Sequence, residues 1–112
     1  MEIEFGSRRL AALCNSQSAM RSRLGPQCAS ALMRRLSQLH AAPNLEALHP
    51  RHMPIGRCHE LTGDLRGMLS MDLRHPQRLI FRPKPPAPHR PDGSLDWSRV
   101  TEIVIEGVDD TH

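Results

Sequence analysis

The sequence predicts an α+β fold in which two amino-terminal helices pack on one face of a mainly antiparallel sheet of four to five strands, in the order β-α-α-β-β-β-β. Two observations support this prediction. Apolar residues recur at helical spacing between residues 7 and 40, and from residue 57 onward the period changes to two. Because 112 residues suffice for one modest core, we expect a single domain over residues 1–112.

The first half of the chain predicts one short strand followed by a helical hairpin. Residues 2–5, EIEF, alternate polar and apolar side chains, and Ser7 can cap the helix that follows. That helix runs to residue 24, and its apolar face comprises Leu10, Leu13, Cys14, Met20 and Leu24. Gly25-Pro26 ends it and begins a second helix.

The second helix is predicted over residues 27–40. Its apolar face comprises Cys28, Leu32, Leu36 and Leu39, and we expect Arg34 and Arg35 to point away from that face. Residues 43–54 predict irregular structure with one helical turn at 45–48. The two thiols on the helical faces, Cys14 and Cys28, are expected to be buried as small apolar side chains.

The second half of the chain predicts strands. Residues 57–61, 68–74 and 78–82 alternate with period two and form an antiparallel meander, with Gly63 available for a turn between the first two. Residues 82–95 contain five of the ten prolines and predict an extended surface loop. Near the carboxyl end, TEIVIEGV predicts a last strand with Ile103 and Ile105 facing inward.

Several function classes are disfavoured by composition. Apolar runs are too short for a membrane span, and the acidic start MEIEFGSRRL lacks the basic and apolar regions of a signal peptide. We therefore expect a cytoplasmic protein with no membrane partner. Three cysteines without a CxxC pair predict neither a disulfide framework nor a zinc site, so no metal or cofactor is expected.

The charge balance permits RNA binding. The formal net charge is +3, and fourteen of the fifteen basic residues are arginine, with Lys84 the exception. An arginine guanidinium can grip a phosphate with two parallel hydrogen bonds. A bias in genomic base composition would give the same preference for arginine, so this observation is compatible with RNA binding without requiring it.

Strand alternation gathers part of this charge on one surface. If Leu79 and Phe81 face the core, Arg78 and Arg82 point outward about 13 Å apart. The same alternation makes Arg57 point with His59. The meander therefore predicts a basic patch that contains one titratable imidazole.

Such a patch suits cleavage of RNA without a metal. This reaction needs a base for the 2′-hydroxyl proton, an acid for the leaving 5′-oxygen and cations for charge on the phosphorane. Histidine can fill either proton role near neutral pH, and arginine supplies the cation. The alternative interpretation is a solvated charged face with an ordinary surface histidine.

The stretch CHELTGDLRGMLSMDLRHPQRLIFRP resembles the RelE/HigB-type toxins of bacterial type II toxin–antitoxin modules, the plasmid killer group of the RelE/ParE superfamily. Residues 110–112, Asp-Thr-His, are similar to the Asp-Tyr-His with which that family characteristically ends. The hairpin positions that carry the resemblance are His59, Leu61, Gly63, Asp64, Gly67, Ser70, Arg78, Leu79 and Phe81.

The resemblance implies a two-helix α+β domain, a ribosome-dependent mRNA endonuclease activity and silencing by a cognate antitoxin. His59 and His112 would be the acid and base, Arg78 the cation at the scissile phosphate, and Asp110 the neighbour of the terminal histidine. Arg66 matches a position that is commonly basic in the family, and it would bind RNA together with Arg57 and Arg82 of the basic patch predicted by strand alternation. The partners expected are the ribosome and mRNA, an antitoxin of the helix-turn-helix DNA-binding type, and operator DNA only through that antitoxin.

Two positions depart from the family pattern. Thr111 stands where the family has a tyrosine that stacks on or orients the nucleotide, and Thr62 stands where a lysine is frequent. Loss of a stacked aromatic costs about 1–3 kcal/mol per base. The resemblance therefore leaves a second reading open, a non-catalytic or gyrase-targeting protein of the same fold that acts by binding its antitoxin or target.

Overall fold

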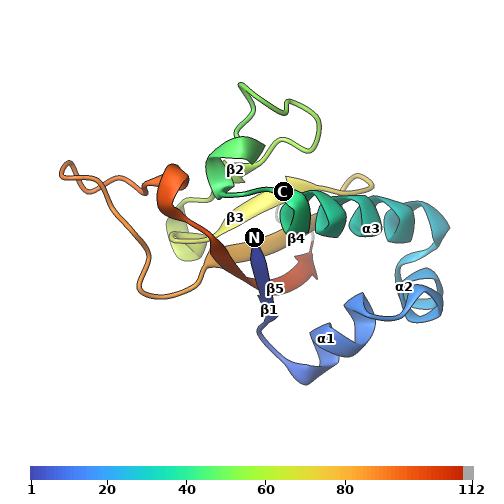
Figure 1. Cartoon of the computed structure of the whole chain (residues 1–112). Coiled ribbons are helices and arrows are strands. Elements are labelled where there is room, and N and C mark those ends of the chain that lie inside the picture. The colour runs from blue at the N-terminus through green and yellow to red at the C-terminus, as the bar shows by residue number, and fades with distance from the viewer. Residues whose placement is uncertain (110–112) are drawn as a thin grey trace.

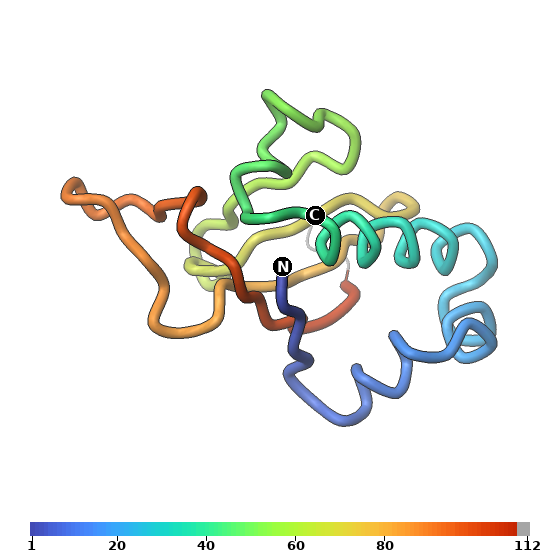
Figure 2. Tube along the Cα trace, in the orientation of Figure 1, coloured from blue at the N-terminus to red at the C-terminus, as the bar shows by residue number. Residues whose placement is uncertain are grey.

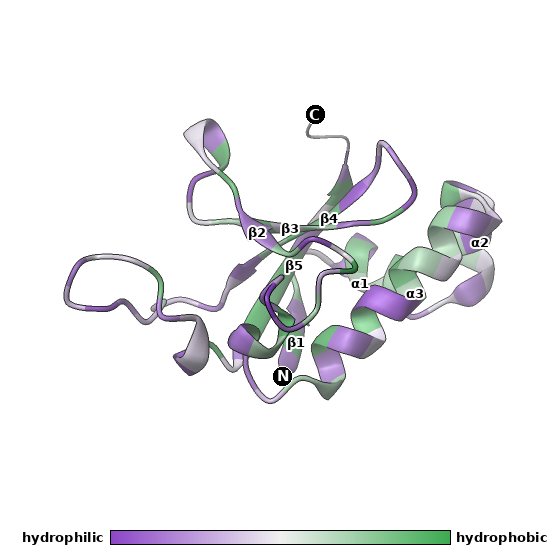
Figure 3. Cartoon of the chain, turned by 90° about the horizontal axis from the view of Figure 1, so that it is seen from above, coloured by the Kyte–Doolittle hydropathy of each residue, from purple (hydrophilic) through white to green (hydrophobic). Residues whose placement is uncertain are grey.

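The computed structural model describes residues 1–109, which form a five-stranded sheet with three α-helices grouped on one side (Figures 1 and 3). The α+β class predicted from the sequence is confirmed. The helices are α1 (Arg8–Cys14), α2 (Gln17–Leu24) and α3 (Pro26–Ala41). The strands are β1 (Glu2–Phe5), β2 (His59–Glu60), β3 (Leu69–Asp72), β4 (Arg78–Pro83) and β5 (Glu102–Asp109). Short 3-10 turns lie at Leu45–Leu48, Gly63–Leu65 and Trp97–Arg99.

The strand order is β1-β5-β4-β3-β2. The predicted meander of β2, β3 and β4 is antiparallel, and β5 adds to it antiparallel to β4. β1 then pairs with β5 in parallel, which makes the sheet mixed. Strand β5 departs from regular register between the partners of Ile80 and Phe81, where it carries a bulge.

The first predicted helix is in fact two helices. The side-chain amide of Asn15 donates to the Ala11 carbonyl at the end of α1, and the Ser16 hydroxyl accepts from the Ala19 amide at the start of α2. These side chains satisfy backbone groups that a continuous helix would use. The prediction of a single helix over residues 8–24 is therefore wrong at this break.

Helix α3 covers the inner face of the sheet. Pro26 occupies its first turn, where a missing backbone N–H costs nothing. Its apolar face packs on fully buried strand residues, and together they make the core, which includes Ala29, Leu32, Leu39, Leu69, Met71, Leu79, Phe81, Ile103 and Ile105. The predicted inward positions in β4 and β5 are thus confirmed, and so is burial of Cys14 and Cys28.

Arg35 corrects a second prediction, because it points into the protein. The residue is only 7% exposed, and its Nε donates to the main-chain carbonyl of Asp72 at 2.9 Å. Nη1 donates to Gln38 Oε1 at 3.0 Å. Burial lowers the pKa of the Arg35 guanidinium, the neighbouring charge of Arg34 lowers it further, and Asp72 opposes both. The helical period alone missed this residue because its partner is a backbone carbonyl of a distant strand.

Gly56 completes what we call the Arg35 cluster, namely Arg35, Gly56 and Asp72. The Asp72 amide donates to the Gly56 carbonyl at 2.7 Å. Gly56 has φ +98°, and a Cβ at this position would lie 3.1 Å from Arg35 Nε. A residue without a side chain is therefore needed both for the backbone conformation and for the close approach of the guanidinium.

The strand predicted over residues 57–61 is shorter in the structure. Only His59 and Glu60 pair with β3, and Arg57 has φ +49° in the left-handed region. Arg57 therefore lies in a turn rather than in the strand. Two local hydrogen bonds engage its backbone, because the Arg57 amide donates to the Pro54 carbonyl at 3.3 Å and the Arg57 carbonyl lies 2.7 Å from His59 Nδ1.

The proline-rich segment forms the loop between β4 and β5 and extends away from the helices (Figure 2). Because β4 continues to Pro83, the loop begins at Lys84 rather than at residue 82. An isolated bridge between His89 and Leu95 closes its outer part. The Asp92 carboxylate accepts from the amide and hydroxyl of Ser94, which lowers the pKa of Asp92.

Within residues 1–109, none of the helices is both long enough and apolar enough to cross a membrane.

We expect Arg35→Ala to lower the free energy of unfolding by about 3 kcal/mol, because it leaves the half-buried Asp72 carbonyl without this donor and opens a void where the buried Arg35 side chain was. Arg34→Ala is the matched control, since Arg34 is exposed in the same helix and makes the same change in helix propensity. Urea unfolding of the two variants measures the difference. Equal losses would contradict the role of the Arg35 cluster.

Gly56→Ala should lower the free energy of unfolding by about 3 kcal/mol, since it combines an unfavourable positive φ with crowding against Arg35. Gly67→Ala provides the control because Gly67 has φ +93° but nothing within 4 Å of its added Cβ. The control isolates the backbone cost, which is about 1 kcal/mol. Thermal or urea unfolding that shows the same loss for both would mean that the contact with Arg35 has no energetic weight.

Candidate functional site

The face of the sheet turned away from the helices, the outer face, carries three rows of side chains. Directly paired residues of antiparallel strands project to the same face, as do residues two apart along a strand. The register of β2, β3 and β4 therefore fixes which side chains are neighbours. In order along the strands the rows are Arg57, Asp72 and Arg78; His59, Ser70 and Ile80; Met68 and Arg82.

The first row is an arginine–aspartate–arginine arrangement. Arg57 Nη1 lies 3.5 Å from Asp72 Oδ2, and Arg78 Nε lies 3.6 Å from Asp72 Oδ1. The Arg57 side chain is 67% exposed and that of Arg78 only 14%. The Arg57 guanidinium is thus available to a ligand in solution, whereas that of Arg78 lies against the sheet beside a half-buried carboxylate.

His59 lies in the second row with its ring oriented by the backbone. Its Nδ1 is 2.7 Å from the carbonyl oxygen of Arg57. A carbonyl oxygen only accepts hydrogen bonds, so Nδ1 must carry the proton. In the neutral ring Nε2 then keeps its lone pair and can take a proton from a bound hydroxyl. The left-handed backbone of Arg57 belongs to the turn that brings its carbonyl to the histidine.

Ser70, the Cα partner of His59, was not predicted as a site residue. It is fully buried, and its hydroxyl has no hydrogen-bond partner among the described residues. A buried polar group without a partner is uncommon. Its position in the His59 row follows from strand alternation, and Ser70 is one of the positions that carry the family resemblance, but neither signal predicts that its hydroxyl is buried.

The outer face is less basic than the sequence predicts. Arg82 Nε pairs with Glu106 Oε1 at 3.0 Å, and Lys84 Nζ pairs with Glu4 Oε1 at 2.7 Å. Asp72, Glu106 and Glu4 therefore interleave with the cations. The predicted basic patch is present as a set of paired charges rather than as a continuous positive surface.

The structure brings together some of the predicted site residues. Arg57, His59 and Arg78 occupy adjacent rows, and Arg82 stands in the next row along β4. Arg66 lies in the turn between β2 and β3 and is exposed. The two remaining catalytic predictions, Asp110 and His112, lie outside the described residues. Asp109, which precedes them in sequence, lies at the end of β5, where it is the register partner of Arg78 in β4.

No metal-binding group of three or more His, Cys, Asp or Glu side chains exists within residues 1–109. Asp72 and Glu106 on the outer face are engaged by arginines. The thiol nearest to the site is also a poor ligand and nucleophile, because burial, helped by Glu60, raises the pKa of Cys58 to about 12. Proton transfer and cation chemistry are what the described side chains offer.

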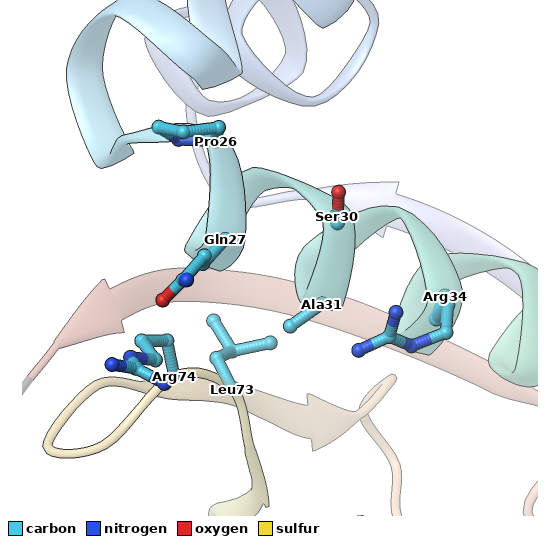
Figure 4. Close-up of a pocket in the computed structure, with 7 residues that line it drawn as sticks. All are labelled: Pro26, Gln27, Ser30, Ala31, Arg34, Leu73 and Arg74. Atoms are coloured by element: carbon cyan, nitrogen blue, oxygen red, sulfur yellow. The ribbon is translucent and has the colours of Figure 1, made fainter.

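A hollow of about 510 Å³ lies on the other side of the sheet, between α3 and the turn that joins β3 to β4 (Figure 4). Ala31 and Leu73 form its apolar part, and the side chains of Arg34 and Arg74 flank it. It is separate from the outer face and shares none of the residues of the three rows.

Comparison with known proteins does not assign this chain to a family, since no protein-family model and no curated protein matches it.

The tautomer of His59 can be tested directly. At a pH of about 9, where an ordinary imidazole is neutral, nitrogen NMR should show a protonated Nδ1 and an unprotonated Nε2 for His59. His49 is an internal control with the opposite arrangement, because its Nδ1 accepts from the Arg51 amide at 3.2 Å. A protonated Nε2 on His59 would contradict its role as a proton acceptor through that atom.

Proposed function

We propose that this protein is the toxin of a type II toxin–antitoxin module and inhibits translation by ribosome-dependent cleavage of mRNA. The single observation that carries the proposal is the orientation of His59, whose Nε2 is available as a proton acceptor one row away from Arg57 and Arg78. The β-α-α-β-β-β-β layout of the RelE type is part of the proposal, with α1 and α2 together taking the place of the first helix.

The proposed chemistry uses proton transfer and arginine cations. His59 Nε2 takes the proton of an RNA 2′-hydroxyl as that oxygen attacks the adjacent phosphorus. The bond from phosphorus to the 5′-oxygen breaks, and an acid returns a proton to the leaving oxygen, which leaves a 2′,3′-cyclic phosphate and a 5′-hydroxyl. The proposed acid is His112, with Asp110 beside it, and Arg78 stabilises the charge on the phosphorane.

Arg57, Arg66 and Arg82 are proposed to bind the RNA backbone around this centre. Exposed guanidiniums give a salt-dependent attraction to phosphates without reading sequence. The partners proposed are the ribosome with its mRNA and a cognate antitoxin, through which alone the module would bind operator DNA. The cytoplasm, where ribosomes work, is the proposed location.

A second candidate is a toxin-fold protein that cuts nothing and acts by binding its antitoxin or DNA gyrase. The ion pairs of the outer face favour it, because Arg57 and Arg78 share Asp72 and Arg82 is paired with Glu106. Paired charges are typical of a surface that recognises another protein's charge pattern. The presence of threonine at position 111, where the family has a tyrosine, also favours this second candidate.

We expect His59→Ala and His112→Ala each to reduce RNA cleavage by roughly 10²- to 10⁴-fold, the usual contribution of a general acid or base. Cleavage is measured on translating ribosomes by mapping new mRNA ends to codon positions, alongside growth inhibition in cells. His89→Ala is the matched control, since His89 is exposed in the proline-rich loop. Thermal unfolding establishes that each variant is folded.

Two results would overturn the proposal. If a folded chain lacking residues 110–112 inhibits growth as strongly as the whole chain, the terminal histidine has no catalytic role. If the purified protein blocks gyrase supercoiling and produces no RNA ends, the second candidate is correct.

A further inference from the structure

A hollow of about 260 Å³ lies on the outer side of the sheet where the proline-rich loop meets the turn between β2 and β3. It is lined by Arg66 and Met68 from the turn, by Arg82 and Pro83 from β4, and by Pro85 and Ala87 from the loop. Its wall is more apolar than the ion-paired face beside it, and its two charged side chains are both arginines.

The two guanidiniums are able to contact a ligand. Arg66 is exposed and makes no ion pair within the described part of the chain. Arg82 is 38% exposed, and Glu106 engages its Nε. In residues 1–109 no partner is found for the terminal Nη atoms of Arg82, which leaves them able to donate to an anion.

The remaining walls suit a flat apolar ring. Pro83, Pro85 and Ala87 present rigid, nonpolar surface, and Met68 adapts its shape to what it contacts. Arginine planes stack on nucleobases much as aromatic rings do. The chain has no tyrosine, so a base held here would be stacked by a guanidinium and prolines instead of by an aromatic side chain.

The position of the hollow relative to His59 is fixed by register. Leu69 pairs with Phe81, so the preceding residue, Met68, stands opposite Arg82 in the third row. The second row, which contains His59 and Ser70, is two residues from Met68 along the chain, or about 7 Å. A strand of RNA with its phosphate beside His59 can therefore extend a neighbouring nucleotide into the hollow.

We propose that this hollow is a subsite for one nucleobase of single-stranded RNA, with Arg66 and Arg82 holding the base plane and an adjacent phosphate. The inference rests on the proposed function and adds to it the residues that replace the missing aromatic platform. The subsite lies on the side of His59 opposite to Arg78, so it positions the strand without taking part in proton transfer.

Amide NMR of the whole chain, titrated with each of the four nucleoside 5′-monophosphates, tests the subsite. At least one nucleotide should shift the amides of Gly67, Met68 and Ala87. Ribose 5-phosphate should bind about tenfold more weakly than that nucleotide, because it lacks the base. Arg66→Gln should weaken nucleotide binding by about tenfold, whereas Arg90→Gln, which removes an exposed arginine at the far end of the same loop, should leave it unchanged.

Equal binding of ribose 5-phosphate would reduce the hollow to a phosphate site, and shifts confined to other amides would place the nucleotide elsewhere. Either result overturns the subsite. Nucleotide binding in the hollow by a protein that cleaves no RNA would refute the proposed function and leave the subsite standing. If Arg66→Gln changes neither the positions of RNA cleavage nor the affinity for the nucleotide, the subsite is refuted and the proposed function stands.

Discussion

The hydrogen bond from the buried Arg35 guanidinium to the main-chain carbonyl of Asp72 is the interaction on which the arrangement of the site depends. A charged side chain this deeply placed costs several kcal/mol unless its donors are satisfied. The Arg35 side chain therefore has few other conformations that would satisfy its donors. It joins α3 to the end of β3, and the Gly56 carbonyl, bonded to the Asp72 amide, is carried into the same cluster. A helix, a strand and a loop thus meet at one fixed point.

The site residues Arg57 and His59 follow Gly56 of the Arg35 cluster closely along the chain. Gly56 leads directly to Arg57, whose left-handed backbone presents a carbonyl to His59 Nδ1 and whose side chain returns to the Asp72 carboxylate. Asp72 therefore serves two purposes, since its backbone anchors the helix and its side chain joins Arg57 to Arg78. The orientation of the histidine is set by backbone hydrogen bonding and not by contacts among exposed side chains. The outer face is accordingly pre-organised before any ligand binds.

The sequence predicts the periodic parts of this fold and misses the contacts between distant segments. Alternation located β3, β4 and β5, and the helical period located α3, because burial of one face imposes a regular spacing. The break at Asn15 and Ser16 was missed because local side-chain capping competes with an apolar period that continues across it. A local pattern also does not predict that β1 pairs in parallel with β5, because the two strands are far apart in the sequence.

In the candidate site, too, the periodic pattern predicts some positions and misses contacts between distant segments. Arg57, His59 and Arg78 were placed on one face by alternation, although Arg57 proved to lie in a turn. The helical period predicts the wrong side of the helix for Arg35, since a spacing rule cannot anticipate a buried cation bonded to a backbone carbonyl 37 residues away.

Replacing the RNA 2′-hydroxyl shows whether His59 activates that group for attack on the phosphorus. An mRNA carrying a single 2′-O-methyl group at a mapped cut site is presented on ribosomes beside the unmodified mRNA, and the ends of the products are identified. We expect cleavage of the unmodified site to a 2′,3′-cyclic phosphate and a 5′-hydroxyl, with the methylated site left intact. Cleavage of both mRNAs, or products ending in a 3′-hydroxyl and a 5′-phosphate, would contradict this role of His59.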